Sequence, residues 1–401
     1  MYKSVFILGR QPAIGLAELE SLLGGVHVEP IGEFAAGSDI AVEQIDFARL
    51  GSSVKLGTFL GEVEAKDWRS VQGALSDAAL ACAEDIAEGK VQLGLSTYGT
   101  RTQARQLLGA GLEIKKRLRA HGYSVRLVPN QEPALSSAQV LHNHLCGERG
   151  IELLAVQAGR QTILARSVAV QDINAYAARD QGRPKRDAFV GMLPPKLAQT
   201  IVNLAMAAAD PKLGGVVLDP FCGTGVVLQE ASLMGFDIYG SDLAPRMVDF
   251  ASENLRWLET HAGHVTSHNP EKTYFKLEVG DATTHHWQPV PQFVAGETYL
   301  GHPLGSWPVP EKLRTIIGTC NVIIEKFLRN IGAQLPAGTR LCLAVPAWHA
   351  PDGTLHHLPL LDQLAQMGYN RISFEHVQAR DLVYFRPDQL VARELLVIIR
   401  K

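Results

Sequence analysis

The chain of 401 residues has no apolar run long enough to span a bilayer, few cysteines and little net charge. Residues 1–10 hold an apolar run that is too short for a signal peptide and is typical of a first strand. Five scattered cysteines argue against a disulfide framework and against a zinc site. The formal charge of −3 excludes a uniformly basic nucleic-acid binder, although not a local basic face. These absences predict a soluble, cytoplasmic protein.

The organisation along the chain predicts two folded portions joined by a linker. Length alone favours two or three units, and 46% hydrophobic residues suffice for full-sized cores. The sequence contains no internal repeat and no low-complexity segment. Residues 178–190 contain glycine, proline and several cations, so we expect a linker there. It would join an N-terminal portion, residues 1–177, to a C-terminal domain, residues 191–401.

Periodicity in the two portions differs. The N-terminal portion has mixed α/β texture, with helices expected at 17–23, 107–121 and 136–145, strands at 90–95 and 124–128, and a hairpin of 151–157 with 162–170. From residue 216 onward, strands and helices alternate, which predicts a doubly wound α/β fold with a parallel sheet and a final hairpin-like pair. Its expected strands are 216–219, 236–240, 274–279, 292–296, 339–345, 371–377 and 394–399.

A glycine turn after the first of these strands predicts a nucleotide-type cofactor site. Asp219 ends the strand, Gly223 and Gly225 form the turn, and Asp242 follows the next strand, where doubly wound folds bind a ribose diol. A dinucleotide fingerprint needs a third glycine, but Leu228 stands in its place. Asp219 would repel a phosphate and suits a cationic ligand. S-adenosylmethionine carries a sulfonium and an ammonium, so the sequence favours a methyl donor over NAD.

The ends of three successive strands resemble the motifs of class I S-adenosylmethionine-dependent methyltransferases. Residues 219–225 are similar to motif I in the form used by nucleic-acid amino-methyltransferases. Residues 239–243 resemble the second motif and residues 279–282 the third. The resemblance implies that Asp242 binds the ribose hydroxyls and that Asp281 reaches the adenine amino group.

The resemblance extends upstream, to the THUMP-containing tRNA guanosine-N2 methyltransferases. Residues 183–187 and 191–199 resemble the segment before motif I in that family, which packs against the methionine end of the cofactor. The opening residues 8–19 and the segment 167–176 resemble its RNA-binding half more loosely. The N-terminal portion is therefore expected to be a THUMP-like RNA-binding module. The cofactor residues implied are Pro194, Asp219, Phe221, Cys222, Gly223, Thr224, Gly225, Asp242, Leu243, Asp281 and Ala282.

The expected catalytic segment departs from the pattern of this family. Amino-methyltransferases of the group carry Asp/Asn-Pro-Pro-Tyr/Phe after the fourth strand, whereas this chain has Glu297-Thr298-Tyr299. A guanine amine needs oxygen acceptors that localise its lone pair and an aromatic ring that holds the base in line with the sulfonium. We expect Glu297 to be the acceptor and Tyr299 the stacking ring. The missing prolines and the longer acid leave altered substrate or lost activity as an alternative.

Two basic clusters are candidates for contact with RNA, since counterion release drives such binding. One lies in the expected helix 107–121 and the other in the expected linker; their members are Lys115, Lys116 and Arg117, and Arg183, Lys185 and Arg186. A solvated helix face explains the first cluster equally well. Structured RNA is read largely by shape and phosphate contacts, so few base-reading residues are needed. Paired histidines lack a completing cysteine or acid cluster, and no metal site is expected.

We therefore expect a two-part enzyme that transfers a methyl group from S-adenosylmethionine to the exocyclic N2 amine of a guanosine in tRNA. The resembling family modifies position 10. One alternative is an N6-adenine or N4-cytosine DNA methyltransferase, and another is a catalytically impaired protein that binds cofactor and RNA. An NAD-dependent oxidoreductase is less favoured. The sequence leaves open which tRNA is modified, whether one or two methyl groups are added, whether a small activator subunit is needed, and whether the chain is a monomer or a homodimer.

Overall fold

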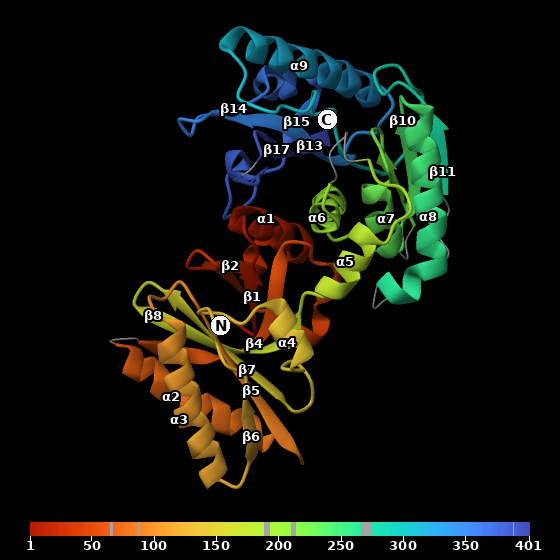
Figure 1. Cartoon of the computed structure of the whole chain (residues 1–401). Coiled ribbons are helices and arrows are strands. Elements are labelled where there is room, and N and C mark those ends of the chain that lie inside the picture. Colours follow the sequence, from red (N-terminus) through yellow and green to blue (C-terminus); the bar gives the residue numbers. More distant parts are fainter. Residues whose placement is uncertain (65–66, 87, 188–192, 210–213, 266–274, 388) are drawn as a thin grey trace. The chain divides into compact units, whose positions relative to one another are not determined.

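The computed structural model describes the chain except for residues 65–66, 87, 188–192, 210–213, 266–274 and 388. The described residues form two compact units, which are coloured along the sequence in Figure 1. The first unit comprises Met1–Leu16, Leu23–Ala48 and Ser52–Ile173. The second comprises Ala17–Leu22, Arg49–Gly51 and Asn174–Lys401. Each helix in the described part of the chain is too short or too polar to cross a membrane.

The first unit is built on an eight-stranded sheet with the order β2-β3-β1-β4-β8-β7-β5-β6. Its strands are β1 (Ser4–Leu8), β2 (Val28–Ile31), β3 (Ala35–Ser38), β4 (Ser53–Glu64), β5 (Lys90–Tyr98), β6 (Ser124–Leu127), β7 (Gly150–Ala158) and β8 (Gln161–Val170). Strand β5 runs parallel to β6 and β7, and the other neighbours are antiparallel. The expected hairpin is confirmed as β7 and β8.

Helices α2 (Trp68–Glu84) and α3 (Ala104–Ala120) bury their apolar faces in this unit. Leu75 of α2 and Ile114 and Leu118 of α3 belong to one buried cluster with Leu93 of β5 and Ile151 of β7. The spacing of Ile114 and Leu118 is the four-residue repeat of a helix face. The helix expected at 107–121 is therefore confirmed. A short helix, α4 (Ser137–His142), begins with a capping box at Ser136.

The second unit contains a sheet with the order β11-β10-β9-β12-β13-β17-β15. These strands are β9 (Val216–Asp219), β10 (Asp237–Asp242), β11 (Phe275–Val279), β12 (Phe293–Glu297), β13 (Arg340–His349), β15 (Tyr369–Arg371) and β17 (Val391–Arg400). From β11 through β10, β9 and β12 to β13, each strand runs parallel to its neighbour. Strand β17 is antiparallel to both β13 and β15. Two short strands, β14 (Leu355–His356) and β16 (Val383–Tyr384), pair with β13 and β17. The doubly wound fold with a final antiparallel pair is confirmed.

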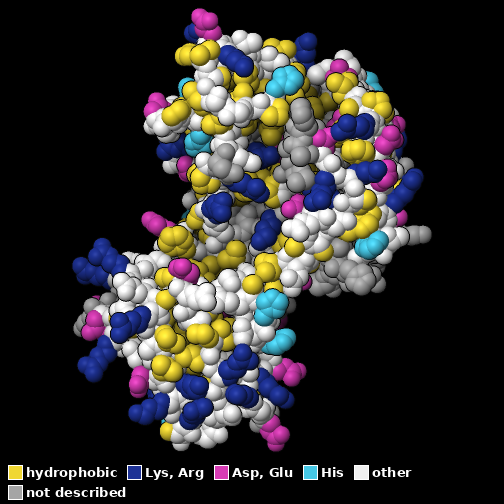
Figure 2. All heavy atoms as spheres, in the orientation of Figure 1, with side chains coloured by type: hydrophobic (Ala, Val, Ile, Leu, Met, Phe, Trp, Pro, Cys, Tyr) yellow, Lys and Arg dark blue, Asp and Glu magenta, His cyan; other side chains and the backbone are white. Residues whose placement is uncertain are grey.

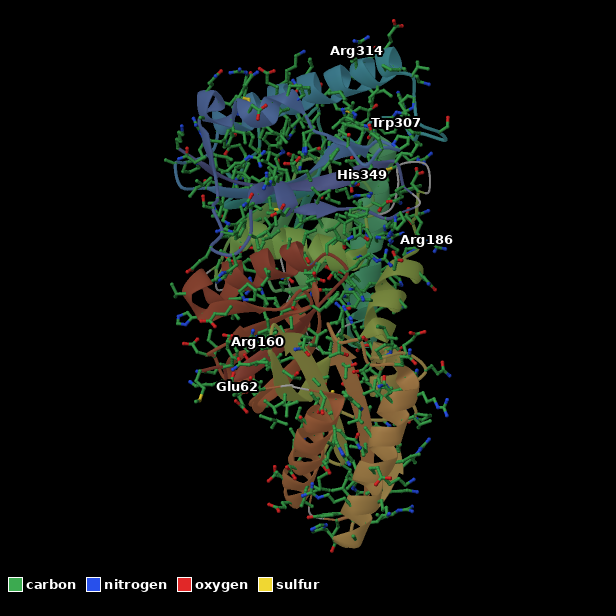
Figure 3. All side chains as sticks on the ribbon, turned by 90° about the vertical axis from the view of Figure 1, so that its left-hand side faces the viewer. Glu62, Arg160, Arg186, Trp307, Arg314 and His349 are labelled. Carbon is green, nitrogen blue, oxygen red and sulfur yellow. The ribbon has the colours of Figure 1, made fainter. Side chains whose placement is uncertain are left out.

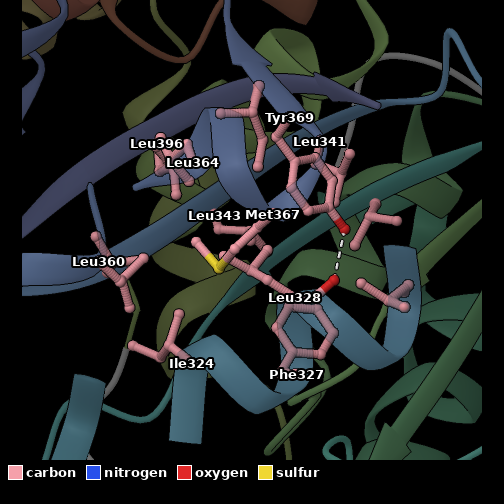
Figure 4. Packing of buried hydrophobic residues seen from close by; sticks show 14 of the residues in the cluster. Ile324, Phe327, Leu328, Leu341, Leu343, Leu360, Leu364, Met367, Tyr369 and Leu396 are labelled. Carbon is pink, nitrogen blue, oxygen red and sulfur yellow. Dashed lines mark hydrogen bonds between the residues drawn. The ribbon is translucent and has the colours of Figure 1, made fainter. Parts of the chain in front are cut away.

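Helices cover both faces of this sheet (Figure 1). They are α6 (Pro195–Met206), α7 (Val226–Leu233), α8 (Pro245–Val265) and α9 (Pro310–Gly332), and they are preceded in the chain by α5 (Ile173–Gln181). Figure 4 shows how Phe327 and Leu328 of α9 pack with the strand residues Leu341 and Leu343. The buried Tyr369 hydroxyl donates a hydrogen bond of 2.7 Å to the carbonyl of Leu328. A polar tip that is satisfied in this way lets the whole ring enter the core.

The compact units differ from the expected domain limits in two respects. The division falls between Ile173 and Asn174, inside a helix rather than in a linker that starts at residue 178. Residues 17–22 and 49–51 also belong to the second unit, because their polar groups bond to α6. The buried Glu18 carboxylate accepts hydrogen bonds from Gly51 N (2.9 Å) and Asn203 Nδ2 (2.7 Å).

One expected strand is largely wrong. Of residues 371–377, only Arg371 lies in a strand, β15, and residues 372–377 have no strand assignment. The backbone of this segment is held in another way: the amides of Glu375 and His376 donate to the carboxylate of Glu20, at 2.6 and 2.9 Å. A partner 355 residues away cannot be inferred from local periodicity.

Candidate functional site

The glycine turn after β9 has the backbone conformation that its sequence predicts. Gly223 and Gly225 have φ of +51° and +84°, a region that residues with a Cβ rarely adopt. A Cβ at Gly225 would also lie 3.1 Å from Ala251 Cβ of α8. The turn leads directly into α7, whose N-cap is Gly225. The first turn of a helix is thereby presented to the carboxyl edge of the sheet.

The leucine that replaces a third glycine is accommodated by another residue. Leu228 is fully buried in α7, and its Cδ1 lies 2.5 Å from where a Cβ on Gly240 would stand. Gly240 belongs to β10, so the space is made on the sheet rather than on the helix. The missing third glycine on the helix is thus matched by a glycine on the neighbouring strand.

Each of four neighbouring strands has an acidic residue at its carboxyl end or shortly after it. In the sheet order β11-β10-β9-β12 these acids are Asp281, Asp242, Asp219 and Glu297. Because parallel strands place their carboxyl ends at the same edge, the four residues lie along one side of the sheet. Asp281 belongs to the turn that follows β11. The three acids of the expected cofactor motifs are therefore brought to one edge, with the expected catalytic acid beside them.

The two central acids of this row are desolvated. Asp219 is 2% exposed, and its Oδ1 accepts a hydrogen bond of 3.1 Å from Phe221 N. Burial raises the pKa of Asp219 well above its ordinary range, and the charges of Asp242 and Glu297 raise it further. Burial also raises the pKa of Asp242, against the hydrogen bonds from Ala244 N and Gly223 N, each 2.9 Å. Such a concentration of carboxylates favours a cationic ligand.

The remaining residues of motif I contribute backbone and shape. Cys222 is buried and its amide donates to the Ser241 carbonyl at 2.9 Å. Burial raises the pKa of the Cys222 thiol well above its ordinary range, which disfavours a reactive thiolate. The Phe221 ring packs edge-to-face on Phe327, with 5.0 Å between centroids. The side chains of Phe221 and Cys222 therefore face the protein interior, and their backbone is what remains for a ligand.

The residues expected around the nucleoside are placed unevenly. Leu243, directly after Asp242, is 70% exposed, as an apolar surface for a flat ring would be. Asp281 is exposed, and its Oδ1 accepts hydrogen bonds from Thr283 N (2.9 Å) and Thr283 Oγ1 (2.8 Å). The Ala282 side chain is buried in the core below α9. Pro194 caps the N-terminus of α6 and is partly exposed.

Sequence reasoning missed Asn254, which holds the turn in place. This residue of α8 is fully buried, and its Nδ2 donates to the carbonyls of Thr224 (2.8 Å) and Lys185 (2.9 Å). Its Oδ1 accepts from Lys185 N at 2.9 Å. Asn254 therefore ties the segment before α6 to the glycine turn. Nothing in the local pattern of α8 distinguishes this asparagine from a solvated one.

The expected catalytic acid is engaged by a cation that sequence reasoning also missed. Glu297 ends β12, and its Oε1 accepts a hydrogen bond from Arg393 Nε of β17. Thr298, in place of the first proline, is buried and donates from N (3.0 Å) and from Oγ1 (3.2 Å) to the Ala344 carbonyl. The half-buried Tyr299 ring meets the exposed His302 ring edge-on at 6.3 Å. Glu297 and Tyr299 are thus close in the chain, at the edge that carries Asp219.

Further rings lie beyond this segment (Figure 3). Trp307, labelled there, packs at 6.0 Å from the His356 ring, and His349 at the end of β13 lies 4.7 Å from the Phe385 ring. Trp348, by contrast, is completely buried and belongs to the core. Its ring therefore packs the interior and does not line the edge of the sheet that carries the acids.

The first basic cluster lies on α3. Lys116 is exposed and Lys115 is half-buried, while Arg117 pairs with Asp77 of α2 at 2.6 Å and donates to Ser76 Oγ at 3.0 Å. In Figure 2, Lys and Arg side chains gather over the part of the first unit that carries α3 and β6. The cluster therefore offers a cationic surface, although Arg117 is partly neutralised.

The second basic cluster is less exposed than a linker would make it. Arg183 is 2% exposed, and its Nη2 donates to Asp180 Oδ1 at 3.3 Å. Lys185 Nζ lies 3.3 Å from Glu253 Oε2, and only Arg186 is fully at the surface. The six expected RNA contacts stay predictions, with Lys116 and Arg186 the best placed to meet a phosphate.

The donor set at the sheet edge fits S-adenosylmethionine. The buried Asp219 side chain offers carboxyl oxygens to its ammonium, the partly exposed Asp242 suits vicinal hydroxyls, and Leu243 offers an apolar face to adenine. The turn at Gly223 leaves room, because the nearest atom to a Cβ there would be 3.9 Å away. Among the residues that the structure describes, no group of three or more His, Cys, Asp or Glu side chains could hold a metal ion.

Known proteins are similar in sequence to parts of this chain. Residues 183–268 match the family described as RMKL-like, methyltransferase domain. The tRNA (guanine(10)-N2)-dimethyltransferase of Methanothermobacter thermautotrophicus is 43% identical over 96 residues, which are 23% of this chain and 26% of that protein. The enzyme of the same name from Pyrococcus abyssi is 45% identical over 91 residues, 23% of this chain and 22% of its own length. The chain thus spans about a quarter of the length of these curated relatives.

Solved structures share the fold over the whole chain. The crystal structure of TrmN from Thermus thermophilus covers 100% of this chain and 99% of its own, with 19% identity and a TM-score of 0.53. A possible methylase from Clostridium difficile 630 covers 98% and 97%, with 12% identity and a TM-score of 0.50. These likenesses establish the fold. Residues 183–268 are thus similar to an RMKL-like methyltransferase domain, and part of the chain is similar in sequence to proteins named tRNA (guanine(10)-N2)-dimethyltransferase.

Proposed function

We propose that this protein transfers a methyl group from S-adenosylmethionine to the exocyclic N2 amine of a guanosine in tRNA, at position 10. The observation that carries the proposal is the row of acids at the ends of β11, β10, β9 and β12, three of them set for the cofactor and Glu297 set for the amine. Relatives that are 43% and 45% identical to 23% of this chain are named for that substrate and position.

The cofactor supplies an electrophilic methyl group on its sulfonium when it is bound. Asp242 would hold the ribose hydroxyls, Asp219 the cationic methionine end, and Leu243 would pack on the adenine. The narrow turn at Gly223 and Gly225 allows the backbone to approach the cofactor. The chain's main task at this end of the site is to fix the direction in which the methyl group points.

At the other end, Glu297 and Tyr299 would prepare the target amine. The Glu297 carboxylate accepts an amine hydrogen, which turns the nitrogen lone pair out of conjugation with the ring and toward the methyl group. The Tyr299 ring stacks on the base and holds it in line. The bound cofactor would supply the methyl group for the new nitrogen–carbon bond, and Glu297 would be the nearby acceptor for the proton that the amine gives up.

We also propose that residues 1–177 act as a THUMP-like RNA-binding portion, that 178–190 connects it to the catalytic part, and that 191–401 is the methyltransferase domain. Support comes from the exposed cations of α3 and from the neighbour TrmN, whose fold extends over both units. A tRNA substrate implies action in the cytoplasm. The proposal needs no metal.

The test is a transfer assay with labelled S-adenosylmethionine and the purified chain. Substrates are an unmodified tRNA transcript, the same transcript with adenosine in place of guanosine 10, and duplex DNA, each digested to nucleosides afterwards. N2-methylguanosine or N2,N2-dimethylguanosine from the first transcript alone supports the proposal. Methyladenine or methylcytosine in DNA would replace it with the DNA methyltransferase alternative. Cofactor binding without transfer to any of them would favour the alternative of a catalytically impaired protein.

Glu297→Ala connects the activity to the site. Loss of the acceptor should lower transfer at least about 100-fold, the scale of a positioned proton acceptor, with cofactor affinity nearly unchanged. Because Glu297→Ala leaves the Arg393 guanidinium buried without its partner, Glu297→Gln serves as the matched variant that keeps an oxygen acceptor of the same length. Full activity in both variants would contradict the assignment of Glu297.

A further inference from the structure

The ion pair between Glu297 and Arg393 joins the expected catalytic acid to the last long strand of the chain. Arg393 Nε donates to Glu297 Oε1, and the two side chains are 6% and 15% exposed. The partners are 96 residues apart. A buried pair of this kind does not by itself indicate stability, because desolvation opposes the Coulomb attraction. The pair can instead orient the acid, because it lies beside the groups that are proposed to react.

The sheet register explains how the two residues meet. Glu297 of β12 lies opposite Ala344 of β13, and Pro346, two residues further along β13, lies opposite Arg393 of β17. The arginine side chain therefore reaches across β13 to the end of β12. A proline in this central strand is tolerated because β12 has already ended at Glu297, so that its missing N–H is not required there.

Neighbouring residues on β17 keep separate partners. Successive side chains on a strand point to opposite faces, so Arg393 and Glu394 diverge. The buried Glu394 accepts from His357 Nδ1 at 2.5 Å and faces Arg371 Nη2 at 3.5 Å. The Arg371–Glu394 pair therefore belongs to the same sheet but not to the acid row, and it offers a matched control.

Burial opposes the ionisation of Glu297, and Arg393 favours it. Burial raises the pKa of Glu297, and the Arg393 charge and hydrogen bond act in the opposite direction. On the neighbouring strand β9, the charge of Glu297 in turn helps to raise the pKa of Asp219. The Glu394 side chain, with its partner His357, lies on the other face of β17. Arg393 is thus the cation that faces Glu297 among the described neighbours on β9, β10, β13 and β17.

We propose that Arg393 is a positioning residue for methyl transfer: it holds the Glu297 carboxylate by Oε1 and leaves Oε2 to accept the amine hydrogen of the target base. The inference rests on the proposed function and deepens it. Glutamate is one methylene longer than the aspartate of related enzymes, and no proline pair stiffens the segment. The bond from Arg393 supplies the orientation that those features would otherwise provide, and the arginine charge opposes the rise in the pKa of Glu297 that burial causes.

The test compares Arg393→Met, Arg393→Lys and the control Arg371→Met. For each, kcat and KM for tRNA are measured between pH 5.5 and 9.5, with cofactor affinity from calorimetry and folding from thermal melting. Removing the Arg393 charge raises the pKa of Glu297, so the acidic limb of kcat should move to higher pH by about one unit or more. On that limb kcat should fall about 10-fold, with recovery at high pH and less than about 3-fold change in cofactor affinity. Arg393→Lys should keep the limb near its original place, and Arg371→Met should leave the profile unchanged.

The outcomes distinguish failure of the positioning role from failure of the proposed function. An active wild-type protein whose Arg393→Met variant loses kcat equally at every pH, or keeps an unshifted limb, would overturn the positioning role and leave the proposed function standing. A wild-type protein that binds the cofactor but methylates no tRNA would overturn the proposed function and this inference with it. If Arg393→Met does not fold, Arg393→Lys decides: its single donor lacks the fork of arginine, so kcat should fall with the limb in place, and unchanged kcat would refute the need for that geometry.

Discussion

The substitution Gly296→Ala probes the acid row with a single methyl group. A Cβ at Gly296 of β12 would stand 2.5 Å from Asp219 Oδ1, 3.2 Å from its Cγ and 3.5 Å from Pro220 Cδ. Asp219 is buried, and Oδ1 already accepts the hydrogen bond from Phe221 N. The carboxylate must therefore move, and this hydrogen bond must lengthen or break. Gly296 does not have a positive φ, so the substitution adds bulk without backbone strain.

The expected cost follows from these two effects. Overpacking a close-packed site costs about 1–3 kcal/mol. Weakening a hydrogen bond to a charged group contributes about 1.5–3 kcal/mol, or less if Asp219 is protonated. Since relaxation shares the strain between them, we expect a loss of roughly 2–4 kcal/mol in the free energy of unfolding. For a unit of this size that corresponds to a Tm lower by about 5–15 °C.

The same displacement should reduce cofactor affinity. Asp219 in its native position is the acid proposed to face the cationic end of the cofactor, so we expect a Kd for S-adenosylhomocysteine at least about 10-fold higher, the equivalent of one lost hydrogen bond of about 1.4 kcal/mol. Urea unfolding followed by tryptophan fluorescence measures the first effect, and titration calorimetry measures the second.

The matched control is Gly318→Ala in α9, where a Cβ would have no heavy atom within 4 Å. There alanine should raise stability by about 0.4–1 kcal/mol, because it reduces the freedom of the unfolded chain. A Gly296→Ala protein with wild-type stability and wild-type affinity would refute the packing of Gly296 on Asp219 and, with it, the role given to that acid.

Four further outcomes are expected. Asp242→Ala should raise the cofactor Kd about 10- to 100-fold, because a charge-assisted hydrogen bond contributes about 1.5–3 kcal/mol, with tRNA binding unchanged in a filter assay. Tyr299→Leu should lower kcat more than it alters KM for the cofactor, whereas Tyr299→Phe should retain activity if stacking is the role of the ring; equal losses in both would point to the hydroxyl instead. Replacing Lys115 and Lys116 by alanine should weaken tRNA binding. The slope of the binding constant against salt concentration should fall by the equivalent of up to two phosphate contacts, and an unaltered slope would show that α3 is only a solvated face. In the folded protein Cys222 should resist alkylation at pH 8, since burial raises its pKa; mass spectrometry after iodoacetamide treatment would expose the contrary.

The cofactor half of the site could be predicted because its chemistry is local. A strand, a glycine turn and a helix follow one another at Asp219 to Gly225, and their conformations depend on residues within a few positions. Asp242 could be placed as well, because the end of the next parallel strand necessarily lies at the same sheet edge. How Leu228 is accommodated could not be predicted from its local sequence. The space it occupies is made by Gly240, on a different element.

The catalytic half could be only partly predicted. The sequence placed Glu297 and Tyr299 after the fourth strand, but Arg393 could not be connected with them, since it lies in a strand that returns 96 residues later. Asn254 was overlooked on the same grounds. Arg183 was expected at the surface because polar stretches rich in Gly and Pro are usually solvated, yet the structure buries it. The sequence shows that a residue is charged, but it does not show which neighbouring residues will bury it.

The sequence by itself determined which elements form, that they alternate into a doubly wound sheet, and which acids stand at the strand ends, because periodicity and turn chemistry act over a few residues. The tertiary structure decided how those ends are used. It added residues 17–22 and 49–51 to the second unit, buried Asp219, and set Arg393 against Glu297. These outcomes depend on long-range register and on desolvation, and both exist only once distant segments have packed together.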